Sequence, residues 1–224
     1  PMGFYAPAQL VRDAREHGVT VLPVDVTVSG WDTVPEPVAA TGGGPLLQAV
    51  RLGLSRIGGF GEDAAKRLLA ARAEAPFASP EDLARRAALD AHAMALLAQA
   101  DALKPLAGHR HDAAWAVAGV DTRATALLHG TRTHEAAAAL PAPDAATTVL
   151  ADYRSTGLSL TQHPVALLRA QLAAFKVLPA AVLREFPSGR LARASGLVTH
   201  RQRPETAKGV IFVTLEDETG AVNV

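Results

Sequence analysis

The spacing of apolar residues changes along the chain, and each change predicts a different kind of structure. Residues 5–17 place apolar side chains three and four positions apart, which predicts an amphipathic helix ending at Gly18. Residues 19–28 are rich in β-branched side chains and predict a strand, with an edge or bend at Pro23. Helical spacing then dominates until residue 189, where alternation returns. We therefore expect a mainly α-helical chain with an α/β start and a C-terminal β part.

The most informative stretch is residues 54–69, where Gly59-Phe60-Gly61 interrupts a helical apolar spacing. A short strand is expected just before it, at residues 49–54. The two glycines permit positive φ or close approach of a partner, and Phe60 can fill the gap between two helices. A helix starting at this point exposes unpaired N–H groups, which attract phosphate. The pattern predicts a helix-hairpin-helix motif, a sequence-independent grip on a nucleic-acid backbone.

Basic side chains surround this predicted hairpin, including Arg72. We expect a duplex-DNA contact made by the hairpin and its nearest basic neighbours: Gly59, Phe60, Gly61, Arg56, Lys66 and Arg67. The alternative is that the glycines only form a compact turn between packed helices.

A second pair of helices repeats the spacing of the first within residues 77–100. Ser79 and Asp90 are suitable N-caps for the two helices, and Pro80 suits a first helical position. Ala87-Ala88-Leu89 stands where the first pair has Gly-apolar-Gly. We interpret the two pairs as a duplicated unit whose second half braces the first instead of gripping phosphate.

Other segments carry less chemistry. Residues 33–45 are expected to form a flexible linker, because the glycines at 42–44 lack the Gly-Lys-Ser/Thr of a phosphate loop. Residues 119–146 are expected to be a loosely packed connector. His109, His111 and Asp112 supply too few converging ligands, so no metal site is predicted. Further helices are expected at residues 112–118, 147–153, 164–175 and 180–184.

The C-terminal β part is expected to contain strands at residues 191–200, 209–215 and 221–224, with a bulge or bend at Gly196. A basic loop joins the first two strands. This arrangement predicts the opening half of an OB-type barrel, a fold that binds single strands with basic and aromatic groups. An ordinary solvated hairpin is the alternative. The predicted single-strand contacts are Arg201, Arg203, Lys208 and Phe212.

Composition restricts these possibilities. Among 224 residues, 22 basic side chains balance 22 acidic ones, so any DNA-binding surface must be local. The absence of cysteine excludes disulfides and cysteine-ligated metal and suits a reducing cytoplasm. No apolar run is long enough to predict a membrane span. The chain begins at Pro1 and stops inside a predicted strand, so we expect a piece of a longer polypeptide.

The order of these motifs resembles bacterial C-family replicative DNA polymerases. Residues 1–5, 10–15, 17–19 and 31–32 resemble the end of the fingers region of that family. Residues 52–54 and 57–61 resemble the tandem helix-hairpin-helix segment that follows. Residues 157–160, 163–164, 203–204, 207–209 and 215–220 resemble the approach to the OB domain and its start. The sequences Arg-Pro at 203–204 and Ala-Lys-Gly at 207–209 are most similar to those of the error-prone branch, which acts in damage-induced translesion synthesis.

The resemblance implies four segments: the end of the fingers domain and a linker (1–45), a tandem helix-hairpin-helix domain (46–118), a connector with helices (119–188) and the beginning of an OB domain (189–224). It also implies a parent DNA-directed DNA polymerase that uses Mg²⁺ and deoxynucleoside triphosphates by two-metal chemistry. No position here matches the family's catalytic aspartates, so the piece should be inactive alone and need no cofactor.

The expected partners are duplex and single-stranded DNA. No clamp-binding peptide of the replicative branch is found, so an accessory translesion protein that links to the sliding clamp is expected as well. Two other readings remain open. One is a DNA-binding accessory or ligase-type protein that joins helix-hairpin-helix and OB modules. The other is a protein-interaction scaffold whose hairpin no longer binds DNA.

Overall fold

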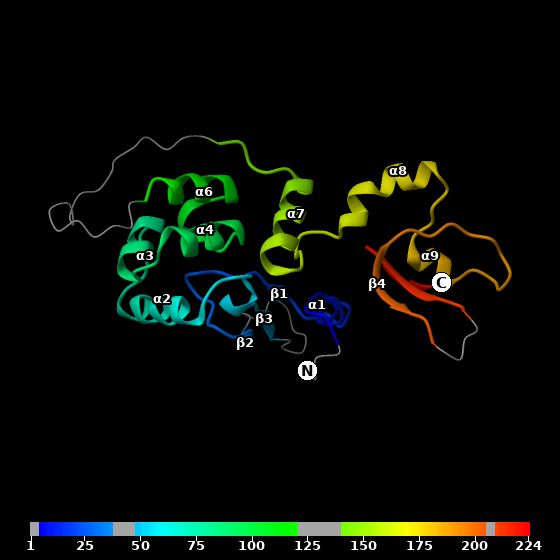
Figure 1. Cartoon of the computed structure of the whole chain (residues 1–224), viewed down its shortest axis with the longest axis horizontal. Coiled ribbons are helices and arrows are strands. Elements are labelled where there is room, and N and C mark those ends of the chain that lie inside the picture. The colour runs from blue at the N-terminus through cyan, green and yellow to red at the C-terminus, as the bar shows by residue number, and fades with distance from the viewer. Residues whose placement is uncertain (1–4, 38–47, 121–139, 205–208) are drawn as a thin grey trace, which may run out of the picture. The chain divides into compact units, whose positions relative to one another are not determined.

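The computed structural model describes residues 5–37, 48–120, 140–204 and 209–224, and these fall into two compact units. The first unit ends at Leu160 and the second starts at Thr161 (Figure 1). The expected four-segment division, with boundaries after residues 45, 118 and 188, stays a prediction.

The first unit combines a small sheet with a stack of short helices (Figure 1). The strand β1 (Val21–Leu22) pairs parallel with β3 (Ala49–Arg51), and β2 (Val34–Glu36) pairs antiparallel with β3, giving the order β1-β3-β2. The helical elements are α1 (Pro7–Glu16), the 3₁₀ turn η1 (Leu54–Arg56), α2 (Glu62–Glu74), α3 (Pro80–Arg86), α4 (Ala91–Gln99), α5 (Lys104–Ala107), α6 (Arg110–Ala118) and α7 (Ala145–Thr156).

The predicted strand at residues 19–28 is wrong beyond Leu22. The carboxylate of Asp25 accepts hydrogen bonds from the Thr27 amide (2.7 Å) and hydroxyl (2.6 Å), and the Ser29 amide donates to the Asp25 carbonyl (2.8 Å). Such side-chain contacts give the backbone an alternative to a sheet ladder. The chain therefore turns here. Val24 and Val26 are nevertheless buried, at 3% and 0% exposure.

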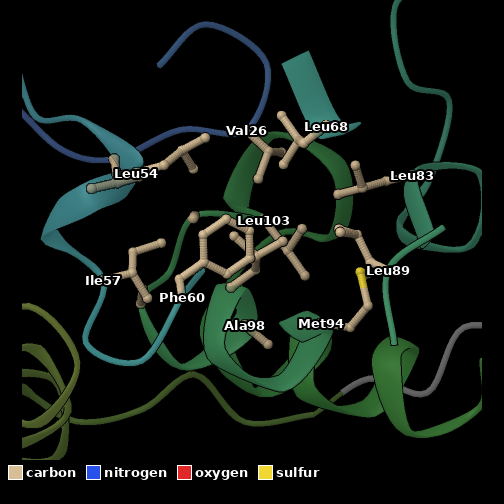
Figure 2. Close-up of a cluster of buried hydrophobic side chains, with 14 of the residues drawn as sticks. Val26, Leu54, Ile57, Phe60, Leu68, Leu83, Leu89, Met94, Ala98 and Leu103 are labelled. Carbon is tan, nitrogen blue, oxygen red and sulfur yellow. The ribbon is translucent and has the colours of Figure 1, made fainter. Parts of the chain in front are cut away.

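One hydrophobic core joins the N-terminal segment to both helix pairs (Figure 2). Phe60 and Leu89 point into the same cluster as Val26. Residues 21–26 were expected in an upstream domain, but in the structure they share this core with the hairpins. The core therefore holds both hairpins in one rigid arrangement.

The turns of the two helix pairs match, in agreement with the predicted duplication, but one residue later than expected: Ala88-Leu89-Asp90, not Ala87-Ala88-Leu89, corresponds to Gly59-Phe60-Gly61. Gly59 has φ +80° in the first turn, and Ala88 has φ +48° at the matching place in the second. Phe60 and Leu89 follow and are both buried. The N-caps of α2 and α4 come next, Gly61 and Asp90. Ser79 caps α3 as predicted, since its hydroxyl accepts from the Asp82 amide at 3.1 Å.

The second unit is a three-stranded antiparallel sheet with short helices. It contains η2 (Pro164–Leu168), α8 (Arg169–Ala174) and α9 (Ala180–Arg184), and the strands β4 (Leu197–Gln202), β5 (Phe212–Asp217) and β6 (Gly220–Asn223) in the order β4-β5-β6. The expected helix at 164–175 is thus divided into a 3₁₀ turn and an α-helix. Within the residues described, these strands do not close a barrel.

The first strand of this sheet was predicted at residues 191–200 but starts at Leu197. The register shift lies between Val198 and His200 instead of at Gly196. Gly196 has a different role: a Cβ there would lie 2.6 Å from the Glu216 carbonyl oxygen, so only glycine fits this close approach.

Asp217 ties the helices of this unit to the sheet. Its carboxylate accepts from the Ala180 amide (2.8 Å) at the start of α9 and from Arg169 (2.9 Å) on α8. Burial alone would raise the pKa of Asp217, but hydrogen bonds from Thr219 and Ala180, together with Arg169, bring it below its ordinary value.

Replacing Ala88 by glycine should stabilise the chain. Ala88 is exposed and strained at φ +48°, so Ala88→Gly removes strain without losing buried surface, a gain of about 0.5 kcal/mol. Its neighbour Ala87 is 1% exposed with φ −88°, so Ala87→Gly should destabilise. Urea denaturation of both variants tests this. If Ala88→Gly destabilised the chain as much as Ala87→Gly does, the claim that Ala88 is strained would be contradicted.

Asp217→Asn should lower the free energy of unfolding by about 2 kcal/mol at neutral pH, because a buried hydrogen-bonded charge is lost. The pKa of Asp217 is depressed, so this stability is present above the pKa of the unfolded chain and is lost as pH falls through that of the folded chain. Denaturation at decreasing pH should show the difference disappear. Glu185→Gln, at an exposed site of the same unit, is the control. A difference independent of pH would refute the account.

Candidate nucleic-acid interface

The N-termini of α2 and α4 differ in what occupies them. The Asp90 carboxylate accepts from the Ala93 amide at 2.7 Å, so a negative charge of the chain itself sits at the start of α4. The equivalent N-cap of α2 is Gly61, which has no side chain to make such a bond. Helix N-termini attract anions. The second hairpin therefore has a carboxylate as its N-cap, and the first has none at the N-cap, although Glu62 and Asp63 lie in the first turn of α2.

Gly61 is not required by the fold. Its φ is −79°, which any residue can adopt, and a Cβ at this position would meet nothing within 4 Å. Gly59 is different, because its φ of +80° favours glycine and its Cβ would lie 3.6 Å from Leu96. The glycine at position 61 thus keeps the backbone accessible from outside, and the packing of the chain does not require it.

Lys66 lies on the first turns of α2, as expected, but it has partners there. Its ammonium is 3.1 Å from the Glu62 carboxylate and 3.8 Å from that of Asp63. The hydrogen bond to Glu62 raises the pKa of Lys66 above its ordinary value. These groups are exposed, and such pairs contribute little to stability. Lys66 can therefore exchange its carboxylate partners for a phosphate.

The arginines near the hairpin mostly serve the chain itself. Arg67 donates to the carbonyls of Ala87 (3.1 Å) and Ala88 (3.4 Å), and so joins α2 to the second hairpin. Arg72 donates to the Val26 and Ser29 carbonyls, both at 2.9 Å. Sequence reasoning expected Arg67 to contact DNA. The structure places its guanidinium at the contact between the two hairpins, in agreement with the bracing role predicted for the second.

Arg56 also contacts a distant segment. Its Nη2 donates to the Thr156 carbonyl at 3.1 Å, and the Gly58 amide donates to the Ser155 carbonyl at 2.7 Å. Both acceptors lie at the C-terminal end of α7. Sequence reasoning missed this contact, because the donors and acceptors are about a hundred residues apart and no local pattern marks them.

A buried ion pair holds α7 against the helix stack. Arg110 on α6 lies 2.6 Å from the Asp152 carboxylate, with side-chain exposures of 9% and 16%. Asp152 also accepts from the Ser159 hydroxyl at 2.7 Å. Leu158 follows α7 and is buried in the core. The C-terminal turn of α7 is thus fixed on both sides of its contact with the hairpin.

The two histidines considered as metal ligands make other contacts. His109 accepts from the Asp112 amide at 3.3 Å and lies 3.1 Å from its carboxylate, while His111 contacts the Pro141 carbonyl at 2.7 Å. No group of three or more potential metal ligands occurs among the described residues. Within the described residues, no helix is both long enough and apolar enough to cross a membrane.

Three of the four predicted single-strand contacts, Arg201, Arg203 and Phe212, lie on or next to the strands β4 and β5 of the second unit. Arg201 pairs with Val213 and Gln202 with Phe212 across β4 and β5, so Arg201 and Phe212 lie at the same end of the two strands. Arg203 follows β4, and all three side chains are exposed. Lys208 lies outside the described residues. Because side chains alternate along a strand, Arg201 shares a face with Val213 and Phe212 shares the other face with Gln202, so the two groups lie at the same end but on opposite faces.

Comparison with known proteins gives consistent results. Residues 18–113 match a family model described as a helix-hairpin-helix motif. The whole chain is 58% identical to the error-prone DNA polymerase of Azoarcus sp. (strain BH72) and 54% identical to that of Bordetella parapertussis. The error-prone DNA polymerase of Burkholderia pseudomallei is also 58% identical. The chain spans 21% of the length of each of these proteins.

Proposed function

We propose that this chain, a homologue of one segment of the error-prone DNA polymerases, is a non-catalytic DNA-binding part of such an enzyme. The first hairpin grips the phosphate backbone of duplex DNA. The parent polymerase uses Mg²⁺ and deoxynucleoside triphosphates for nucleotidyl transfer in translesion synthesis, at aspartates that lie outside this chain. Identity of more than half over the full chain supports this assignment.

The single observation that carries the DNA-binding role is the contrast between the two matched N-caps. Asp90 caps the N-terminus of α4 with its own carboxylate, whereas no side chain caps that of α2, where Gly61 precedes Glu62 and Asp63 of the first turn. Neither the backbone angle nor the packing around Gly61 calls for glycine. A phosphate oxygen has the charge and acceptor capacity to take the position that the Asp90 carboxylate takes in the second hairpin.

The contact is expected to be weak and insensitive to sequence. An anion at a helix N-terminus gains about 0.3–1 kcal/mol, and backbone amides cannot distinguish bases. Lys66 adds a charge on the same turns of the helix. Net neutrality of the chain limits long-range attraction to DNA. This part of the polymerase would hold a duplex in place for chemistry done elsewhere.

The second unit is proposed to be the start of an OB-type barrel that binds the template single strand. Exposed Arg201 and Phe212 at one end of β4 and β5 support this, since such barrels combine cations with stacking rings. Arg203 and Lys208 would add further cations to the same hairpin. An accessory translesion protein that connects to the sliding clamp is the proposed protein partner.

Two other functions predict different behaviour. A ligase-type or accessory DNA-binding protein would share the duplex grip but would lack polymerase carboxylates in its full-length form. A protein-interaction scaffold would have no duplex affinity that depends on salt. Homology along the whole chain to error-prone polymerases favours the polymerase over both.

Gly61→Asp should abolish most duplex binding without destabilising the chain. Asparagine and aspartate are good N-caps, and the space around Gly61 is open, so the free energy of unfolding should be equal or slightly higher. The new carboxylate would occupy the phosphate position, as Asp90 does in the second hairpin, and the affinity should fall about threefold or more. Fluorescence anisotropy with a labelled duplex, over a range of salt concentrations, measures both the affinity and its salt slope.

Two variants separate the causes. Gly61→Asn caps the helix without charge and should lose less affinity than Gly61→Asp. Ala114→Asp adds the same charge to the exposed side of α6 and should change affinity less than twofold or so. Unchanged duplex affinity in Gly61→Asp would refute the hairpin grip. A wild-type chain with no salt-dependent binding would favour the scaffold instead.

A further inference from the structure

We propose that the C-terminal turn of α7 is the element that positions the first hairpin, and that Arg56 is a positioning residue in this contact and not a phosphate ligand. The inference rests on the proposed duplex grip. It assigns a role in that grip to residues 155–157, which lie about a hundred positions beyond the hairpin.

Two hydrogen bonds form the contact. The Gly58 amide donates to the Ser155 carbonyl at 2.7 Å, and Arg56 Nη2 donates to the Thr156 carbonyl at 3.1 Å. The donors immediately precede the turn that contains Gly59 and Gly61. The acceptors are among the last carbonyls of α7, which have no partner within the helix and need one from elsewhere. The hairpin therefore supplies donors for two of the last carbonyls of α7, while α7 holds the hairpin.

The glycines on each side suit this close contact. Gly157 has φ +77° and ends α7 in the left-handed conformation, which directs the Thr156 carbonyl to the arginine. A Cβ on Gly58 would lie 3.4 Å from the Ser155 carbonyl oxygen. Arg56 is half-buried, and a Cβ on Gly157 would be 4.0 Å from its Nη2. A guanidinium held in this way is committed to the protein.

The charge of Arg56 has a second effect in this position. The C-terminal end of a helix carries a partial negative charge, and this one lies against the hairpin that is proposed to bind an anion. The guanidinium offsets that charge at the point of contact. Arg56 would thus favour phosphate binding without touching the phosphate.

The anchor of α7 is independent of the hairpin. The ion pair of Arg110 with Asp152 (2.6 Å) and the burial of Leu158 at 3% exposure hold the helix on its other side. A shift of the α7 turn should therefore displace the hairpin, because the turn is held by the helix stack on one side and bonded to the hairpin on the other.

The first test uses Gly157→Val in the whole chain, with Gly189→Val as matched control. Both glycines have positive φ (+77° and +85°), which valine hardly ever adopts, and neither Cβ would clash. Gly157→Val should speed amide exchange at Gly58 and lower duplex affinity, each about fivefold or more, while Gly189→Val changes neither. If Gly157→Val exchanged its Gly58 amide as slowly as the wild type and bound duplex DNA as tightly, the proposal would be overturned.

The second test replaces Arg56. Glutamine carries no charge and is two bonds too short to reach the Thr156 carbonyl as Nη2 does, so Arg56→Gln, like Arg56→Ala, should speed Gly58 exchange but keep the salt slope of duplex binding. A phosphate ligand would instead lose about 0.9 from the slope in Arg56→Gln. That loss would overturn the proposal.

The two tests also separate this inference from the proposed function. If Gly61→Asp abolishes duplex binding and Gly157→Val leaves it intact, the hairpin grip holds and the role of α7 is wrong. If the wild-type chain shows no salt-dependent duplex binding, both fail. Thermal melts of each variant, compared with wild type, confirm that the changes in affinity come from folded protein.

Discussion

The first four amides of a helix cannot be paired within it, and this constraint separates the two hairpins of the first unit. At α4 the Asp90 carboxylate accepts a hydrogen bond from one of these amides. At α2 no side chain caps the end: the N-cap is a glycine that the backbone does not need, and the Glu62 and Asp63 carboxylates of the first turn lie beside Lys66. The rest of the unit keeps that open end in place: a common core beneath both hairpins, Arg67 between them and α7 beside the first.

Three arginines near the first hairpin donate to main-chain carbonyls. Arg56, Arg67 and Arg72 all donate to carbonyl oxygens of segments far away in the sequence. A carbonyl and a phosphate are both oxygen acceptors, so an arginine near a predicted DNA-binding turn suits either. Only the tertiary structure determines whether such an arginine contacts a carbonyl of the chain or remains available for a phosphate. For this reason the proposed phosphate grip would fall mainly on backbone amides, with Lys66 as its exposed cation.

Local features of the fold were predictable because local chemistry determines them. The caps at Ser79 and Asp90, the turn at Gly59 and the duplication of the helix pair follow from residue types and short spacings. The strand expected at residues 19–28 failed because the Asp25 side chain forms a turn that a β-branched pattern does not reveal. The strands of the second unit were predicted in number and order, but their ends moved by several residues. The contact of α7 with the hairpin depends on tertiary structure, and no spacing in the sequence predicts it.

The most direct measurement is a titration of the isotope-labelled chain with duplex DNA, followed by NMR at single amides. The duplicated hairpins serve as each other's control within one molecule. Binding at the open N-terminus predicts the largest, salt-sensitive shifts at the amides of Phe60, Gly61 and Glu62. Little change is expected at Leu89, Asp90 and Ala91, where the chain supplies its own carboxylate. Equal shifts at both hairpins, or shifts confined to the second, would contradict the central claim.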